Sequence, residues 1–236
     1  RRQRQMCIRD RSKALDKSIF LWYDIYVNFK KDVCQVELQS LANIIQGNIP
    51  TRIEVTTGQS IETITMQELN YIVNVSDDLP IAKYITVQGD KIGTYSLTKE
   101  YDVVVGLSSG KAIVIESNRA DKLILSNLAI IRINDMSEVD PYYLCWFINN
   151  NTAALKQLKK LKQATTAVSI IPLSMLKSFE VTLLPIETQR TIGKISELKR
   201  QQDRLTHSIE TKKTDILTQQ LMKIYEKELQ NGDKRV

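Results

Sequence analysis

The most restrictive feature of this 236-residue sequence is its C-terminal segment, residues 187–229, which holds no proline and a single glycine. A seam with alternating spacings of four and three residues runs along it, as in a coiled coil. Its positions are Leu198, Gln202, Leu205, Ile209, Lys212, Ile216 and Gln219. A helix of this length extends roughly 60 Å. It is too long and too polar to fold on a compact body alone, so we expect a projecting helix that pairs with a partner helix, in cis or in trans.

The residues before this helix, 34–186, have the pattern of one small α+β domain. Aspartate is a good N-cap and proline is preferred at the first helical position, so Asp140–Pro141 predicts the start of a helix. We expect helical structure to continue to about residue 162. A short helix at 173–178 and a final strand should follow. The apolar runs with turns between them predict strands at 83–87, 102–107, 112–116 and 129–133. The expected fold class is therefore α+β, a small mixed-sheet domain followed by a long coiled-coil helix.

The two ends of the chain receive separate interpretations. Residues 4–12, RQMCIRDRS, resemble translated sequencing-adapter sequence, so we interpret residues 1–11 as non-native. Residues 12–33 carry apolar side chains at helical spacing and are expected to form a helical lead-in, such as the remnant of a preceding spacer. Residues 230–236 are expected to be a short tail after the long helix.

Charge and cysteine content narrow the class of protein only partly. The net charge is +6, but residues 12–186 hold 17 basic and 18 acidic side chains, so any positive surface on the body must be local or come from partners. Three scattered cysteines suit a reducing, cytoplasmic location and show neither a disulfide framework nor metal-ligand spacing. No apolar run approaches the roughly 18 residues that a membrane span needs.

The catalytic patterns in the sequence are incomplete. The sequence GLSSGKA at 106–112 is one residue short of a phosphate-binding loop and has Ala112 where a magnesium-binding hydroxyl should stand. DPYY at 140–143 lacks the second proline of the adenine-methyltransferase loop, and a helix start explains it better. The single histidine, His207, has no second member for acid–base or metal chemistry. We therefore expect no catalytic residues, no cofactor and no metal.

Taken together, several segments resemble the specificity subunits of type I restriction–modification enzymes. The matching segments are VELQSLANIIQGNIPTR, LTKEYDVVVGLSSGKAIVIE, LILSNLAIIRIN, DPYYLCWFINN and TTAVSIIPLSMLKSFEVTLLPIETQRTI. The last is the most specific, because it ends in the family's Pro-hydrophobic-Glu-x-Gln pattern at 185–189. The chain departs from the family pattern in that Leu184–Pro185 stands in place of the usual Pro-Pro, and the loop TTAVSI lacks a common Gln-Pro. In the hairpin segment, Glu100–Tyr101 stands in place of the usual glycine before Asp102.

The resemblance implies recognition of double-stranded DNA, with catalysis in other subunits. Loops would read base edges in the major groove while lysines and backbone amides hold phosphates. Methyltransferase subunits would dock and flip out an adenine, and a motor-nuclease subunit would join for restriction. Family members have two recognition domains whose helices pair antiparallel. This chain is therefore either a half-subunit forming a homodimer through its helix or the C-terminal half of a two-domain protein.

The expected DNA-contacting residues are exposed polar side chains at the ends of elements, where readout residues usually lie. They are Asn48, Thr51, Arg52, Lys91, Thr94, Ser108, Ser109, Lys111, Thr165 and Thr166. A plain solvated turn is the alternative for each, and the lysines at 156–162 are either a solvated face or a phosphate contact. The expected partner-contacting residues are Leu198, Leu205, Ile209 and Ile216. The rival hypotheses are a protein-interaction module that dimerises through its helix, a fused enzyme, and a non-functional fragment.

Overall fold

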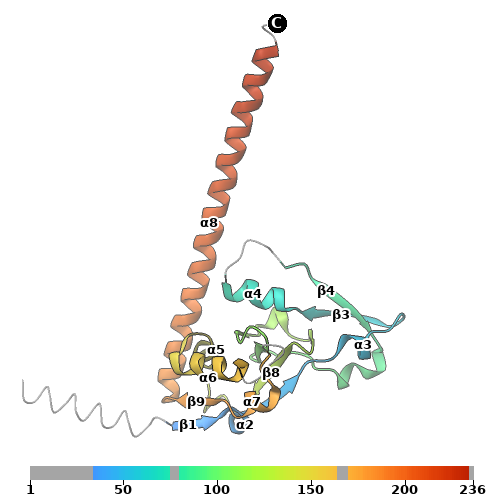
Figure 1. Cartoon of the computed structure of the whole chain (residues 1–236), viewed down its shortest axis with the longest axis vertical. Coiled ribbons are helices and arrows are strands. Elements are labelled where there is room, and N and C mark those ends of the chain that lie inside the picture. Colours follow the sequence, from blue (N-terminus) through green and yellow to red (C-terminus); the bar gives the residue numbers. More distant parts are fainter. Residues whose placement is uncertain (1–33, 75–79, 164–169, 234–236) are drawn as a thin grey trace, which may run out of the picture.

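The computed structural model describes residues 34–74, 80–163 and 170–233. It contains an α+β body, from which one long helix, α8, projects (Figure 1). This architecture confirms the fold class expected from the sequence. The helical lead-in at 12–33 and the segment 1–11 lie outside the described residues.

The centre of the body is a four-stranded antiparallel sheet with the strand order β2-β8-β5-β6. The four strands are β2 (Ala42–Gln46), β5 (Val103–Gly106), β6 (Ala112–Val114) and β8 (Leu128–Ile133). Val103, Val104 and Val105 of β5 are fully buried, which shows that both faces of the sheet are covered. Such double-sided burial explains why these strands are runs of apolar residues rather than alternating sequences.

Two groups of helices cover the two faces of the sheet. On one face, Val103 and Val105 pack with α5 (Pro141–Asn150), the short helices α2 (Leu38–Leu41) and α7 (Leu173–Lys177), and α6 (Thr152–Gln163). On the other face, Val104 packs with Leu69 and Ile72 of α4 (Met66–Asn74). The strand pair β1 (Cys34–Glu37) and β9 (Glu180–Leu183) is antiparallel and leads into α8.

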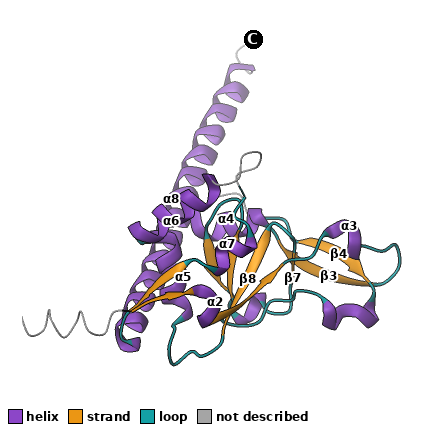
Figure 2. Ribbon diagram, turned by 60° about the horizontal axis from the view of Figure 1, so that its bottom comes forward, coloured by secondary structure: helices purple, strands orange, loops and turns teal. Residues whose placement is uncertain are grey.

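A second, three-stranded sheet extends the body away from α8 (Figure 2). Its order is β4-β3-β7, with β3 (Gln59–Ile64) antiparallel to β4 (Lys83–Val87) and parallel to β7 (Leu123–Ile124). The small helices α3 (Pro50–Ile53) and η1 (Gly89–Thr94) contribute Ile53 and Ile92 to its apolar cluster. The remaining short helix is η2 (Ser117–Arg119). This sheet has its own small core, separate from the two cores of the central sheet.

The start of α5 has the predicted geometry, but its end was not predicted. The Asp140 carboxylate accepts a hydrogen bond from the Tyr143 amide at 2.8 Å, and Pro141 occupies the first turn. Helical structure continues to Gln163, as predicted, but not as one helix. Asn151 interrupts it and caps α6, since its side-chain oxygen accepts hydrogen bonds from the amides of Ala153 and Ala154. An asparagine side chain competes with the helix for backbone amides, and the sequence analysis overlooked this effect.

The long helix, α8, spans Ile186–Asp233, which is 48 residues and roughly 72 Å at 1.5 Å per residue. The expected tail at 230–236 is therefore wrong in part, since helix continues beyond residue 229 to Asp233. No proline interrupts this stretch, and its only late glycine is Gly232. In the described part of the chain, no helix combines the length and the apolar content that crossing a membrane requires.

Candidate nucleic-acid interface

The predicted DNA-contacting residues fall into two groups in the structure. Thr51 and Arg52 on α3, and Lys91 and Thr94 on η1, are exposed and flank the three-stranded sheet. Ser108, Ser109 and Lys111 lie at the tip of the β5–β6 hairpin, on the central sheet. The structure therefore does not bring all of the predicted residues into one cluster. Thr165 and Thr166 lie outside the described residues.

Asn48 connects the two sheets, and its carbonyl side chain is engaged in that connection. Its side-chain oxygen accepts a hydrogen bond from the Ser96 backbone amide at 2.7 Å. The backbone amide of Asn48 donates to the Ile124 carbonyl at 2.9 Å. The preceding Gly47 lies so close to this strand that a Cβ there would be 2.1 Å from the Leu125 carbonyl oxygen. The side-chain oxygen of Asn48 thus has a structural role, which sequence reasoning could not distinguish from a loop position.

The hairpin tip is a tight turn that uses one serine internally and exposes the other. Gly110 has a φ of 68°, a conformation that glycine adopts without steric cost, and its amide donates to the Gly106 carbonyl at 2.7 Å. The Ser109 hydroxyl accepts a hydrogen bond from the Lys111 amide at 3.2 Å. Ser108 is exposed. Of the two serines, Ser108 is therefore the exposed one.

Lys162 is a residue at this tip that the sequence analysis did not place there. Its ammonium group donates to the Ser109 carbonyl at 2.5 Å, and a Cβ on Gly110 would lie 3.1 Å from the same nitrogen. Burial lowers the pKa of Lys162, and the nearby Lys111 lowers it further. An anion bound between the two ammonium groups would offset their repulsion.

The helix that carries Lys162 extends this positive surface. α6 contains four lysines and no acidic residue, and the hairpin residues 106–112 are also free of acidic residues. Lys156, Lys159 and Lys160 are exposed. We call the surface formed by α6 and the hairpin the basic tip; its members are Ser108, Lys111, Lys156, Lys159, Lys160 and Lys162. A near-neutral body can therefore still present a local site for phosphates.

The segment after the undescribed residues returns to the same hairpin. The amide of Ile171 donates to the Leu107 carbonyl at 2.9 Å. The chain therefore leaves α6 beside the basic tip and comes back to it at Ile171. This placement arises from tertiary contacts, because Leu107 and Ile171 are far apart in the sequence.

The joint between the body and α8 is built from Gln189 and Gly193. Gln189 is 1% exposed; its side-chain oxygen accepts from the Asp140 amide at 3.1 Å, and its amide donates to the carbonyls of Glu138 and Leu184 at 2.9 and 2.7 Å. A Cβ on Gly193 would lie 2.6 Å from an Asp140 carboxylate oxygen and 2.9 Å from the Tyr143 nitrogen. The close approach of α8 to the start of α5 therefore requires a glycine. Gln189 is the last residue of the Pro-hydrophobic-Glu-x-Gln pattern.

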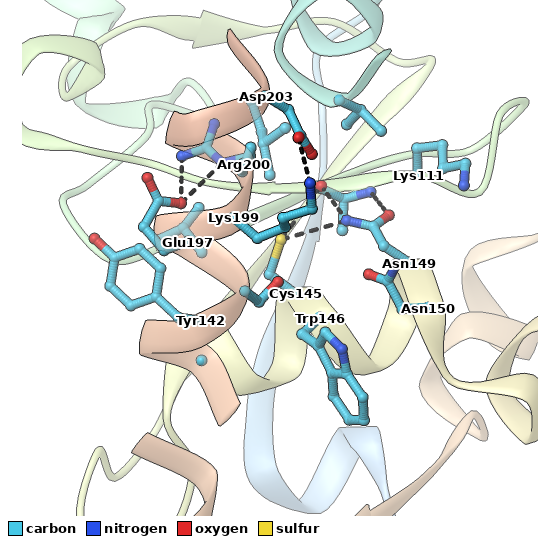
Figure 3. Close-up of a pocket in the computed structure, with 16 residues that line it drawn as sticks. Lys111, Tyr142, Cys145, Trp146, Asn149, Asn150, Glu197, Lys199, Arg200 and Asp203 are labelled. Carbon is cyan, nitrogen blue, oxygen red and sulfur yellow. Dashed lines mark hydrogen bonds and ion pairs between the residues drawn. The ribbon is translucent and has the colours of Figure 1, made fainter. Parts of the chain in front are cut away.

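A pocket of about 280 Å³ lies between the hairpin and this joint (Figure 3). Lys111 comes from the hairpin, Trp146 and Asn149 from α5, and Lys199 and Arg200 from α8. Asn149 covers the edge strand β6, because its side chain accepts from the Ala112 amide at 2.9 Å and donates to the Ala112 carbonyl at 2.8 Å. This capping leaves no open strand edge at Ala112 for another strand to join.

In the described part of the chain, no group of three or more histidine, cysteine, aspartate or glutamate side chains is placed to hold a metal ion. The pocket's charged side chains are paired. Lys199 pairs with Asp203 at 2.5 Å, and Arg200 pairs with Glu197 at 2.5 Å and with Glu116 at 3.5 Å.

The expected seam residues of α8 are exposed. Leu198, Leu205, Ile209 and Ile216 expose 54, 66, 53 and 56% of their surface. At 100° per residue the four positions fall on one side of α8. This helix leaves the body (Figure 1). Apolar side chains with this exposure and spacing are typical of a helix that pairs with another helix.

Comparison with solved structures identifies proteins of the same architecture. No family model and no curated protein matches the chain. The HsdS subunit from Thermoanaerobacter tengcongensis matches over 75% of this chain and 39% of its own length, with 18% identity and a TM-score of 0.50. A chain from a structure that describes complex assembly and conformational transition of the type I R-M system matches over 81% of this chain and 48% of its own length. Its identity is 14% and its TM-score 0.55.

The chain has the fold of a type I specificity subunit. It spans less than half the length of the solved chains that it matches. The fold expected from the resemblance in the sequence is therefore confirmed.

Proposed function

We propose that this chain recognises a DNA sequence for a type I restriction–modification system and carries out no catalysis itself. The observation that carries the proposal is the fold that this chain shares with solved type I specificity subunits. This chain joins an α+β body to a long helix with exposed apolar side chains. The basic tip supports a role for the body in DNA binding. Such a chain would work in the cytoplasm, where the DNA is.

Phosphates are the ligands we assign to the basic tip. Lys111 and Lys162 would hold the backbone and set the register, while Ser108 and the exposed residues of α3 and η1 would reach base edges. The two groups lie on different sheets, so one body would contact DNA at two separate places. This division suits a domain that reads several base pairs along a groove.

The helix α8 is the surface that we assign to protein partners. Its seam would pair with a second helix, either from another copy of this chain or from a second recognition domain. Methyltransferase subunits would dock on the resulting assembly and modify adenine, and a motor-nuclease subunit would join for restriction. The residues of this chain would determine where on the DNA these subunits act.

The decisive test is co-expression with the neighbouring methyltransferase gene, followed by single-molecule sequencing of host DNA for modified adenines. A new modified motif that vanishes when this gene is deleted would establish the specificity function. A stable complex without modification would indicate that a second recognition domain is required. Absence of any complex and of any modification would favour the interaction-module hypothesis.

The basic tip is tested separately with the paired variant Lys111→Gln/Lys162→Gln. Each lysine that no longer neutralises a phosphate should reduce the slope of log affinity against log salt by about one, nearly independently of DNA sequence. Lys177→Gln is the matched control, because Lys177 is exposed but lies on α7, outside the basic tip. An unchanged slope in the paired variant would exclude the basic tip as a phosphate site.

A further inference from the structure

Beyond Gly193, α8 faces the body through polar side chains. Its partly covered residues there are Ser196, Glu197, Arg200, Asp203, Arg204, His207 and Thr211. At 100° per residue this strip lies about 180° from the stripe formed by Leu198, Leu205, Ile209 and Ile216. Hydrophobic packing therefore does not determine where the helix points after it leaves the joint.

A series of ion pairs connects this strip to the body. Arg200 contacts Glu197 on its own helix and reaches Glu116, just after β6, at 3.5 Å. The other Glu116 oxygen lies 3.4 Å from Arg119 of η2. Arg119 in turn pairs with Glu68 of α4 at 3.1 Å. Negative and positive side chains alternate along this series of ion pairs, so each group has a neighbour of opposite charge.

The position of these ion pairs in the fold allows them to restrain α8. α5 holds α8 from one face of the central sheet, whereas α4 covers the opposite face. The ion pairs connect α8 to α4 around the edge strand β6. They therefore restrain the helix on the side that Gln189 and Gly193 do not reach.

The groups in this series of ion pairs are partly shielded from water. The side chains of Glu68, Glu197 and Arg119 are 15, 16 and 19% exposed, and those of Arg200 and Glu116 are 24 and 36% exposed. Tyr142 of α5 lies against the same charges: burial raises its pKa, and Glu116 and Glu197 raise it further. Shielded pairs are weakened less by salt than exposed ones, and they hold one geometry better.

We infer that Arg200 and Glu116 are positioning residues, which fix the direction of α8 relative to the body through their ion pair. Arg200 is the member on the helix, and Glu116 transmits the restraint to η2 and α4. The structural part of this inference stands without the proposed function. Its consequence for DNA, that the two recognition bodies of an assembly are held at a fixed separation and angle, rests on the proposed function.

The test measures the distance distribution between spin labels at Lys177→Cys on the body and Thr218→Cys on the helix, by pulsed electron paramagnetic resonance. Both positions are exposed and outside the series of ion pairs. Cys7 and Cys34 are replaced by serine, and labelled chains are diluted with unlabelled ones so that only distances within one chain count. Arg200→Met should shift and broaden the distribution. Arg200→Lys, which keeps the charge, should restore much of it.

Lys199→Met is the matched control, because Lys199 pairs only within α8, with Asp203. It should leave the distribution unchanged. If Arg200→Met fails to fold, Glu116→Gln decides the question, since it weakens the same contact from the body side. A distribution that Arg200→Met, or in that case Glu116→Gln, leaves as narrow and as centred as in the parent overturns the inference.

A second measurement separates this inference from the proposed function. The same variants are co-expressed with the methyltransferase, and modified adenines are mapped. Broadened distances in a protein whose parent forms no complex with the methyltransferase and directs no modification would refute the function and keep the positioning role. Site-specific modification with unchanged distances would refute the positioning role and keep the function. Broadened distances with reduced modification by Arg200→Met, but not by Lys199→Met, would support both.

Discussion

At the scale of single residues, a few side chains determine how α8 is attached. Gln189 satisfies three backbone groups at the joint, and Gly193 permits the approach of two helices. Elsewhere in a helix a glycine costs up to about 1 kcal/mol relative to alanine. Here the ranking should reverse, because the space for a Cβ is already occupied.

We therefore expect Gly193→Ala to lower the free energy of unfolding by about 1–3 kcal/mol, the usual cost of overpacking. Urea denaturation followed by circular dichroism measures it. Gly93→Ala is the matched control and should have little effect, because no atom lies within 4 Å of a Cβ at that position. A more stable Gly193→Ala protein would show that the helices do not approach as described.

Cys145 gives a prediction about pH. Burial raises the pKa of its thiol to about 12, and its sulfur donates to the Ala112 carbonyl at 3.3 Å. Since the thiolate is the reactive form, Cys145 should react with thiol reagents far more slowly than the exposed Cys34 at pH 8, in a Cys7→Ser background. The native state also retains a proton that the unfolded state loses, so this thiol's contribution to stability should fall as pH rises from about 9 toward 12.

The matched comparison for both effects is Cys145→Ala. Its unfolding free energy should decline less steeply than that of the parent over this pH range. Equal reactivity of Cys34 and Cys145 in the folded protein would contradict the burial of the sulfur.

At the scale of elements, α8 combines two faces with different tasks. Its polar strip contacts the body, and its apolar stripe points away from it. The basic tip shows a similar combination, since a hairpin and a helix from distant parts of the sequence form one surface. In both cases the element itself was predictable and its neighbours were not.

The apolar stripe predicts helix-mediated association. Leu205→Asp/Ile209→Asp should abolish self-association or partner binding, because two buried charges would face the apolar seam, while the circular dichroism of the body stays unchanged. Size-exclusion chromatography with light scattering measures the mass. The control is Thr214→Asp, an exposed position on the opposite side of the helix. Association that survives the double substitution would refute the seam.

At the scale of the whole molecule, the described part of the chain consists of a body and a projecting helix, α8. Under the proposed function, a second body would read a second short DNA site, and the helix would hold that body at a distance. This chain covers 39% of the HsdS subunit from Thermoanaerobacter tengcongensis.

If the second body is another copy of this chain, two-fold symmetry requires the same half-site twice. The modified motif should then be palindromic, as mapped by single-molecule sequencing. A non-palindromic motif would indicate a different second domain. Co-expression with Lys111→Gln/Lys162→Gln, which keeps the seam but weakens the basic tip, is the control, and it should lower the modified fraction if two copies pair.

The sequence by itself determined the α+β class, the helix start at Asp140–Pro141 and the long C-terminal helix with its seam, because these depend on local capping and periodicity. The tertiary structure alone decided that Lys162 joins the hairpin tip, that Asn48 connects two sheets, and that Gln189, Gly193 and the Glu116–Arg200 pair hold the helix. These roles arise from contacts between residues distant in sequence. A hydrogen-bond partner or a steric limit exists only after the chain has folded, so no local pattern records it.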